Sequence, residues 1–125
     1  MNVLQGTLSY NNLIDATAAY KILCELEDYK KASCVIIKHG NPCGVTIDRD
    51  ALAAYKKALE TDPVSAFGGI VGINKQVDEK LAKKILSIFT EVIIAKSFSP
   101  KAIKILSLKK NIKIIDIKSF DGTLL

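Results

Sequence analysis

The pattern of apolar and polar residues divides the chain into segments of two kinds. Apolar residues spaced three or four apart predict amphipathic helices over residues 12–26, 50–59, 78–89 and 100–109. Between them lie short runs of consecutive apolar, largely β-branched residues, which predict strands at 32–37, 69–73, 92–95 and 112–117. Helices and strands therefore alternate along the chain.

Polar residues at the ends of these segments support the division. Asn12 is the expected N-cap of the first helix, and Ser99 with Pro100 is a favourable start for the last one. Asp62 and Pro63 predict a turn after the second helix. In the third helix the periodicity places four apolar side chains toward the core: Leu81, Ile85, Ile88 and Phe89.

Alternating helices and strands predict an α/β fold, with a mostly parallel mixed sheet between helices on both faces, in three layers. No internal repeat or Pro/Gly-rich linker divides the 125 residues, so we expect a single domain over 1–125. Three cysteines allow at most one disulfide, which favours a reducing, cytoplasmic location. The longest apolar runs fall far below the roughly 20 residues that cross a bilayer, and the residues after Met1 do not have the basic-then-apolar pattern of a signal peptide. No membrane association is therefore expected.

The charge balance is basic, with 18 lysines and arginines against 13 acidic residues. All of the basic residues except Arg49 are lysines, and they are scattered over the predicted helices. Nucleic-acid binding usually needs arginine and aromatic side chains together, and the chain has no tryptophan. The charge is therefore best explained as a solvated surface that attracts anionic small molecules, and nucleic acid is a minor alternative.

The densest group of polar residues directly follows the first predicted strand, at residues 38–44. Ligands of open α/β sheets bind beyond strand ends, so Lys38 and the only histidine, His39, stand at a favourable place. Histidine exchanges protons near neutral pH, and a neighbouring lysine can share in acid, base or oxyanion chemistry. A structural histidine beside a solvated lysine is an equally open interpretation, and a Schiff-base lysine is a third.

Zinc is a weaker possibility for the same segment. His39 and Cys43 are four residues apart, but the chain contains no C-x-x-C pair, and Cys24 and Cys34 lie within apolar patterns where thiols usually pack. The zinc-deaminase signature is also incomplete, because Thr46 stands where its second cysteine would be. No metal is therefore expected.

Two further features could contact a ligand. Residues 62–69 form a turn with paired glycines that lets a ligand approach the backbone closely, although a tight structural bend would have the same sequence. This turn lacks the lysine of a phosphate-binding P-loop. Glu91 stands at the start of the third predicted strand, where it could accept hydrogen bonds from a ligand or be an ordinary solvated residue.

Four runs occur together in a fixed order: LSYNNLIDA at 8–16, KHGNPCG at 38–44, DPVSAFGG at 62–69 and EVIIA at 91–95. In this combination the sequence resembles the bifunctional family of phosphoribosylaminoimidazolecarboxamide (AICAR) formyltransferase and IMP cyclohydrolase. The likeness extends from about residue 4 to 115, and K-H-x-N-P-C-G with D-P-x-S-A-F-G-G is its most specific part.

The resemblance implies one lobe of the formyltransferase domain, with a three-layer fold like that of cytidine deaminase and no zinc. It implies transfer of a formyl group from 10-formyltetrahydrofolate to the amine of AICAR, a step of purine (IMP) biosynthesis. Lys38 and His39 match the family's catalytic pair, and Gly68 and Glu91 match positions that contact AICAR. Asn41 and Phe67, in the same motifs, are expected at the substrate, and Val64 on the folate side.

The sequence also departs from the family pattern. The run R-Y-G-x-N-P-H-Q, the cyclohydrolase domain and the second formyltransferase lobe are not found in it, and Lys96 stands where a proline is usual. Because family sites form between lobes and across a homodimer, the resemblance implies half a cleft, completed by a homodimer partner or a complementary fragment. Activity of the chain alone is not expected. The rival hypothesis is a non-catalytic lobe that binds a partner chain or a purine nucleotide.

Overall fold

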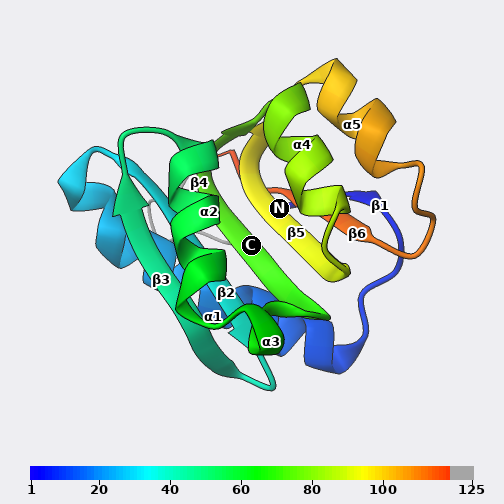
Figure 1. Cartoon of the computed structure of the whole chain (residues 1–125). Coiled ribbons are helices and arrows are strands. Elements are labelled where there is room, and N and C mark those ends of the chain that lie inside the picture. Colours follow the sequence, from blue (N-terminus) through cyan, green and yellow to red (C-terminus); the bar gives the residue numbers. More distant parts are fainter. Residues whose placement is uncertain (119–125) are drawn as a thin grey trace.

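The computed structural model describes residues 1–118 and contains one six-stranded sheet flanked by helices (Figure 1). The strands lie in the order β1-β6-β5-β4-β2-β3. Their bounds are β1 Asn2–Gln5, β2 Ala32–Lys38, β3 Asn41–Asp48, β4 Gly69–Val77, β5 Thr90–Phe98 and β6 Lys113–Asp116. The helices are α1 Tyr10–Leu26, the 3₁₀ turn η1 Glu27–Tyr29, α2 Ala51–Thr61, α3 Pro63–Ala66, α4 Glu79–Leu86 and α5 Pro100–Leu106.

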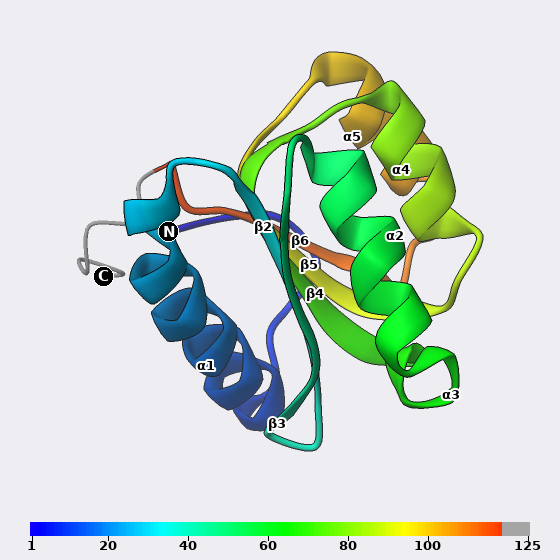
Figure 2. The ribbon, with the colours of Figure 1, turned by 60° about the vertical axis from the view of Figure 1, so that its left-hand side comes forward.

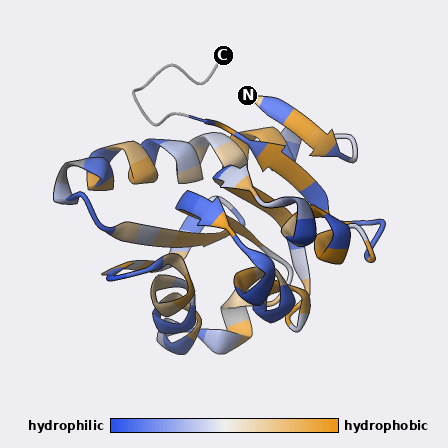
Figure 3. Cartoon of the chain, turned by 90° about the horizontal axis from the view of Figure 1, so that it is seen from above, coloured by the Kyte–Doolittle hydropathy of each residue, from blue (hydrophilic) through white to orange (hydrophobic). Residues whose placement is uncertain are grey.

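The helices cover both faces of the sheet, which confirms the predicted three-layer α/β fold. Helix α1 lies on one face, and α2, α4 and α5 lie on the other (Figure 2). Alternate residues of the central strands therefore enter different cores: Val35 and Ile37 of β2 pack under α1, whereas Cys34 and Ile36 pack under α2. All four are fully buried, as expected for a strand without polar alternation. Figure 3 shows the apolar residues gathered in the sheet between the helical layers.

The sheet is less parallel than the sequence pattern predicted. The pairs β4–β5 and β5–β6 are parallel, because α4 and α5 carry the chain back across the sheet. The pairs β2–β3, β2–β4 and β1–β6 are antiparallel. The expectation of mostly parallel pairing was wrong because it treated residues 38–44 as a loop. The chain instead reverses within two residues and returns as β3.

Most predicted elements are present, with shifted ends. Strands β1 and β3 and the short helix α3 were not predicted, and α4 ends at Leu86 instead of continuing to residue 89. Leu81 and Ile85 are buried as expected, but Phe89 lies beyond the helix and is 46% exposed. Asn12 is not the N-cap of α1: Ser9 is, and Asn12 occupies the third helical position. None of the helices in residues 1–118 is both long and apolar enough to cross a membrane.

Candidate active site

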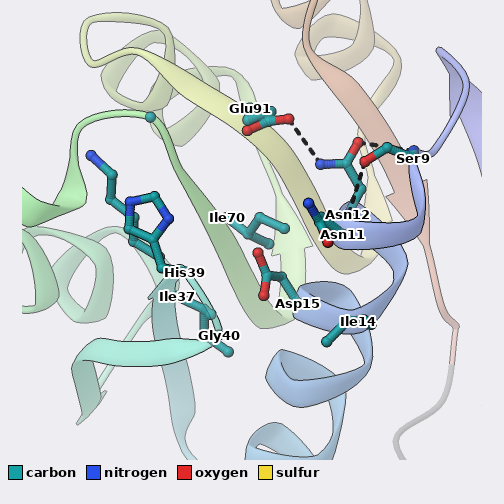
Figure 4. Close-up of a pocket in the computed structure, with 12 residues that line it drawn as sticks. Ser9, Asn11, Asn12, Ile14, Asp15, Ile37, His39, Gly40, Ile70 and Glu91 are labelled. Atoms are coloured by element: carbon teal, nitrogen blue, oxygen red, sulfur yellow. Dashed lines mark hydrogen bonds between the residues drawn. The ribbon is translucent and has the colours of Figure 1, made fainter.

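A cleft of about 520 Å³ lies where the first turn of α1 faces one end of the central strands (Figure 4). It is bounded by the carboxyl end of β2 and by the amino ends of β4 and β5. Its volume is within the usual range for small-molecule sites. Its lining consists mainly of polar residues: Ser9, Asn11, Asn12, Ile14, Asp15, Ile37, Lys38, His39, Gly40, Gly68, Ile70 and Glu91.

A two-residue hairpin turn places the lysine and histidine at this cleft. Lys38 pairs with Asn41 across the turn, so only His39 and Gly40 connect β2 to β3. Both have positive φ, 54° for His39 and 76° for Gly40, as a type I′ turn requires. The turn bends the chain sharply enough that Lys38 and His39, although adjacent, both line the cleft. The amide of Asn41 donates to the His39 carbonyl oxygen at 3.2 Å and so braces the turn.

The ammonium group of Lys38 is held by the glycine turn before β4. Its Nζ donates to the carbonyl oxygen of Phe67 at 2.5 Å. Gly68 follows with φ of 78°, and a Cβ at this position would lie 3.3 Å from the Phe89 ring and 3.9 Å from Lys38 Nζ. The rings of Phe67 and Phe89 pack with centroids 5.3 Å apart. Glycine at position 68 therefore lets the backbone turn while leaving room beside the ammonium group.

On another side of the cleft, Glu91 of β5 is bound to α1. The side-chain amide of Asn12 donates to Glu91 Oε1 at 2.9 Å. Asn12 is itself fixed by a capping box with Ser9, in which each residue's backbone N–H donates to the other's side-chain oxygen. Lys113 of β6 adds an ion pair, with Nζ 3.6 Å from Glu91 Oε1.

The antiparallel orientation of β2 brings these groups together. Lys38 ends β2, whereas Glu91 stands near the start of β5. In a wholly parallel sheet these two ends would lie at opposite edges. Because β2 runs antiparallel to β4 and β4 runs parallel to β5, the two residues meet at the same edge. The general rule for parallel sheets, which places ligands at carboxyl ends, would have separated them.

Four of the residues predicted from the sequence line this cleft: Lys38, His39, Gly68 and Glu91. The other three do not. Asn41 braces the hairpin, and Phe67 contributes its carbonyl oxygen to Lys38 while its ring packs on Phe89. Val64 lies on α3 and is 83% exposed, outside the cleft.

Sequence reasoning missed the contribution of α1. Ser9, Asn11, Asn12 and Asp15 all line the cleft. These residues were used to place a helix start and as part of the run 8–16 that carries the resemblance, but none was predicted at the site. So many polar residues at the head of an apolar helix could have indicated one. The sequence could not show that α1 points its first turn at the end of β2, because that depends on how the helix packs across the sheet.

The thiols of Cys34 and Cys43 do not line the cleft. Burial, and next the charge of Asp62, raise the pKa of Cys43, which lies on β3 and does not line the cleft. The fully buried Cys34 packs in the core under α2, where burial also raises its thiol pKa. Within residues 1–118, no three His, Cys, Asp or Glu side chains gather closely enough to hold a metal ion.

Solved structures with the same fold include a dCMP deaminase and RibD. The structure resembles dCMP deaminase from the cyanophage S-TIM5 with a TM-score of 0.61, at 13% identity, over 86% of this chain and 99% of that one. It resembles RibD from Acinetobacter baumannii with a TM-score of 0.63, at 14% identity, over 93% of this chain and 39% of that one. At such low identity the likeness shows the fold alone, and the chain thus has a deaminase-like α/β fold.

The sequence comparisons define the family within this fold. The profile of the AICARFT/IMPCHase bienzyme family matches residues 1–123, and the chain belongs to this family. It is 50% identical over 112 residues to the bifunctional purine biosynthesis protein PurH of Fusobacterium nucleatum, and 49% identical over 113 residues to PurH of Bradyrhizobium diazoefficiens. Each alignment covers 90% of this chain but only 22% and 21% of those relatives, so the chain spans about a fifth of their length.

Proposed function

We propose that this chain is one lobe of the formyltransferase part of a PurH-type protein, acting in purine biosynthesis. Its cleft would bind AICAR, and 10-formyltetrahydrofolate would be the formyl donor. The observation that supports this most is that Lys38, His39, Gly68 and Glu91, which match family motifs far apart in the sequence, line one cleft. The family name covers two activities, and these motifs favour the formyltransferase over the cyclohydrolase.

The cleft suits a reaction in which an amine nitrogen attacks a formyl carbon. As the new C–N bond forms, the amine must lose a proton, and the bond from the formyl carbon to N10 of the folate must break. The imidazole of His39 would take the amine proton and return it to the leaving nitrogen. In the described part of the chain, this ring makes no hydrogen bond to the protein, so both of its nitrogens can face a substrate.

Lys38 and Glu91 would have complementary parts in this reaction. The ammonium group, already oriented by the Phe67 carbonyl, would stabilise the negative charge that develops on the formyl oxygen. Because its orientation is set before substrate binds, little reorganisation is required during the reaction. The Glu91 carboxylate can only accept hydrogen bonds when ionised, so it would bind amino or hydroxyl groups of AICAR.

The cleft is open to solvent, and the exposed Val64 lies outside it. We therefore assign the folate side, and the rest of the nucleotide site, to elements that approach this lobe from outside. A second lobe, a complementary fragment or a homodimer partner would supply them. This arrangement is the reason to expect little turnover by the 125-residue chain alone.

A formyltransfer assay tests the proposal. The chain would be measured alone and mixed with the remaining part of a PurH relative from which the matching segment has been deleted. We expect turnover only in the mixture, and we expect His39→Ala and Lys38→Ala to lower it about 10²–10⁴-fold. The matched control is Lys84→Ala, which removes an exposed lysine of α4 away from the cleft.

Three outcomes would count against the proposal. Turnover that survives both substitutions would remove the catalytic pair from the reaction. A mixture that gains only the ability to cyclise formylated AICAR would assign the chain to the cyclohydrolase. Nucleotide binding without turnover in any mixture would instead support the alternative, a non-catalytic lobe that binds a purine nucleotide.

A further inference from the structure

Both protein contacts of the Glu91 side chain fall on the same carboxylate oxygen. Asn12 Nδ2 lies 2.9 Å from Oε1, and Lys113 Nζ lies 3.6 Å from the same atom. In the described part of the chain no protein donor contacts Oε2. The Glu91 side chain is 42% exposed, so this second oxygen is open to a ligand.

The orientation of the Asn12 amide is fixed by its other hydrogen bond. Asn12 is only 3% exposed, and its Oδ1 accepts the backbone N–H of Ser9 at 3.2 Å (Figure 4). An amide turned the other way would put its NH₂ group against that N–H and its oxygen against the Glu91 carboxylate. Both contacts would then be repulsive, so the NH₂ group of Asn12 must face Glu91.

The Lys113 side chain is also confined. It is 24% exposed, and its stem lies against Gly6, where a Cβ would be 2.7 Å from Lys113 Cγ. Gly6, directly after β1, therefore lies over the stem, and the ammonium group reaches Glu91 at the edge of the cleft. Its positive charge attracts the Glu91 oxygen that it faces, Oε1, at 3.6 Å.

We infer that Asn12 is a positioning residue that, together with Lys113, holds Glu91 by one oxygen and leaves the other to accept a hydrogen bond from a ligand hydroxyl or amino group. The identity of that ligand as AICAR rests on the proposed function. The support of Glu91 itself does not, because it consists of contacts within this chain.

Asn12→Asp separates the positioning role from the capping role. The aspartate keeps an oxygen for the Ser9 N–H and suits the first turn of a helix, but it replaces the donor to Glu91 with a second carboxylate. Glu91→Gln in the same chain restores a donor–acceptor pair with the direction reversed. The control, Asn111→Asp, makes the same chemical change at an exposed position before β6.

The first measurement is the melting temperature of the two single variants and the double variant. We expect Asn12→Asp to lower it by roughly 4 °C, and the double variant to recover most of that loss. The inference is overturned if the double variant melts at the same lowered temperature as Asn12→Asp, or if the losses of the two single variants simply add. Either result would show that the two side chains are not coupled.

The second measurement is the affinity for AICAR ribonucleotide by isothermal titration calorimetry. We expect Asn12→Asp to weaken it about tenfold at pH 8. Near pH 5 the difference in affinity between Asn12→Asp and the wild-type chain should be smaller, because the two facing carboxylates of the variant then share a proton and regain a donor. The affinity of the wild-type chain, measured at the same two pH values, is the control for the other charged groups around the site: Asp15, Lys38, His39 and Lys113.

A purely structural role for Asn12 predicts an affinity loss that does not change with pH, and that result would also overturn the inference. If the wild-type chain binds no nucleotide, the proposed function fails instead. The melting temperatures then still decide whether Asn12 holds Glu91.

Discussion

His39 has a backbone conformation that suits glycine or asparagine better than histidine. Its φ of 54° lies in the left-handed region, where a side chain meets the following carbonyl oxygen. The type I′ turn imposes this conformation, and the same turn points the imidazole into the cleft. Residues held in sparsely populated backbone regions are concentrated at functional sites, which supports the role proposed for His39.

The substitution His39→Asn should therefore separate stability from activity. Asparagine followed by glycine is the preferred sequence for this turn, so we expect the free energy of unfolding to stay the same or rise by up to about 1 kcal/mol. Formyltransfer in the complemented mixture should be lost. Urea denaturation measures the first effect, with Gly40→Ala as the control that should destabilise the turn. A marked destabilisation by His39→Asn would mean that the imidazole supports the hairpin.

Cys34 makes the stability of the fold sensitive to alkaline pH. Burial raises the pKa of this thiol above its ordinary value of 9.0, so the folded chain keeps the proton at a pH where the unfolded chain has lost it. Deprotonation of this thiol therefore leaves the free energy of unfolding unchanged below about pH 9. Above that pH it lowers the free energy of unfolding progressively. The expected slope is up to about 1.4 kcal/mol per pH unit. Burial of Tyr55, with an ordinary pKa of 10.0, acts in the same direction at higher pH.

Denaturation between about pH 8 and pH 11 tests this prediction. Cys34→Ala should flatten the decline, whereas Cys24→Ala, on the half-buried side of α1, should leave it steep. Equal slopes for wild type and Cys34→Ala would show that the buried thiol does not contribute to the alkaline loss of stability.

At the scale of elements, the sequence predicted well those segments whose pattern is set by burial on both faces. Strands β2, β4, β5 and β6 are apolar throughout their centres, so each was found. The edge strand β3 was missed because it begins in Asn41 and Pro42, residues that usually mark loops, and because only alternate residues of it are covered. Strand β1 has four residues, three of them exposed, which is too little pattern to recognise.

The direction of a strand is harder to predict than its existence. Helical connections implied parallel pairing, which is correct for β4, β5 and β6. The direction of β2 depends on a turn of two residues, and His39 is an uncommon residue at its first position. Lys38, His39, Gly68 and Glu91 were thus predictable one by one, whereas their meeting at one edge of the sheet and the contribution of α1 were not.

The start of α1 links helix stability to the site. Ser9 caps α1 and Ser99 caps α5, each accepting the backbone N–H three residues on. We expect Ser9→Ala and Ser99→Ala each to lower the free energy of unfolding by about 1 kcal/mol, measured by urea denaturation. Only Ser9→Ala should also weaken nucleotide binding, because Asn12 loses its partner. Equal affinity in both variants would disconnect the cap from the cleft.

In the molecule as a whole, the two faces of the sheet differ in the helices that cover them. Helices α2, α4 and α5 cover one face with the larger core. Within residues 1–118, α1 is the one α-helix on the other face (Figure 2). Its N-cap and first turns supply residues that line the cleft. The chain can therefore keep a stable sheet while leaving one edge open to a ligand and to further protein elements.

The proposed recognition of AICAR by this open cleft is tested most directly by an NMR titration of the ¹⁵N-labelled chain with AICAR ribonucleotide. Saturable shifts are predicted for the backbone amides of Asn12, His39, Gly40 and Gly68, and no shifts are predicted for α4 across the sheet. Shifts confined to α2 and α4, or unchanged amides at the cleft up to millimolar nucleotide, would contradict it.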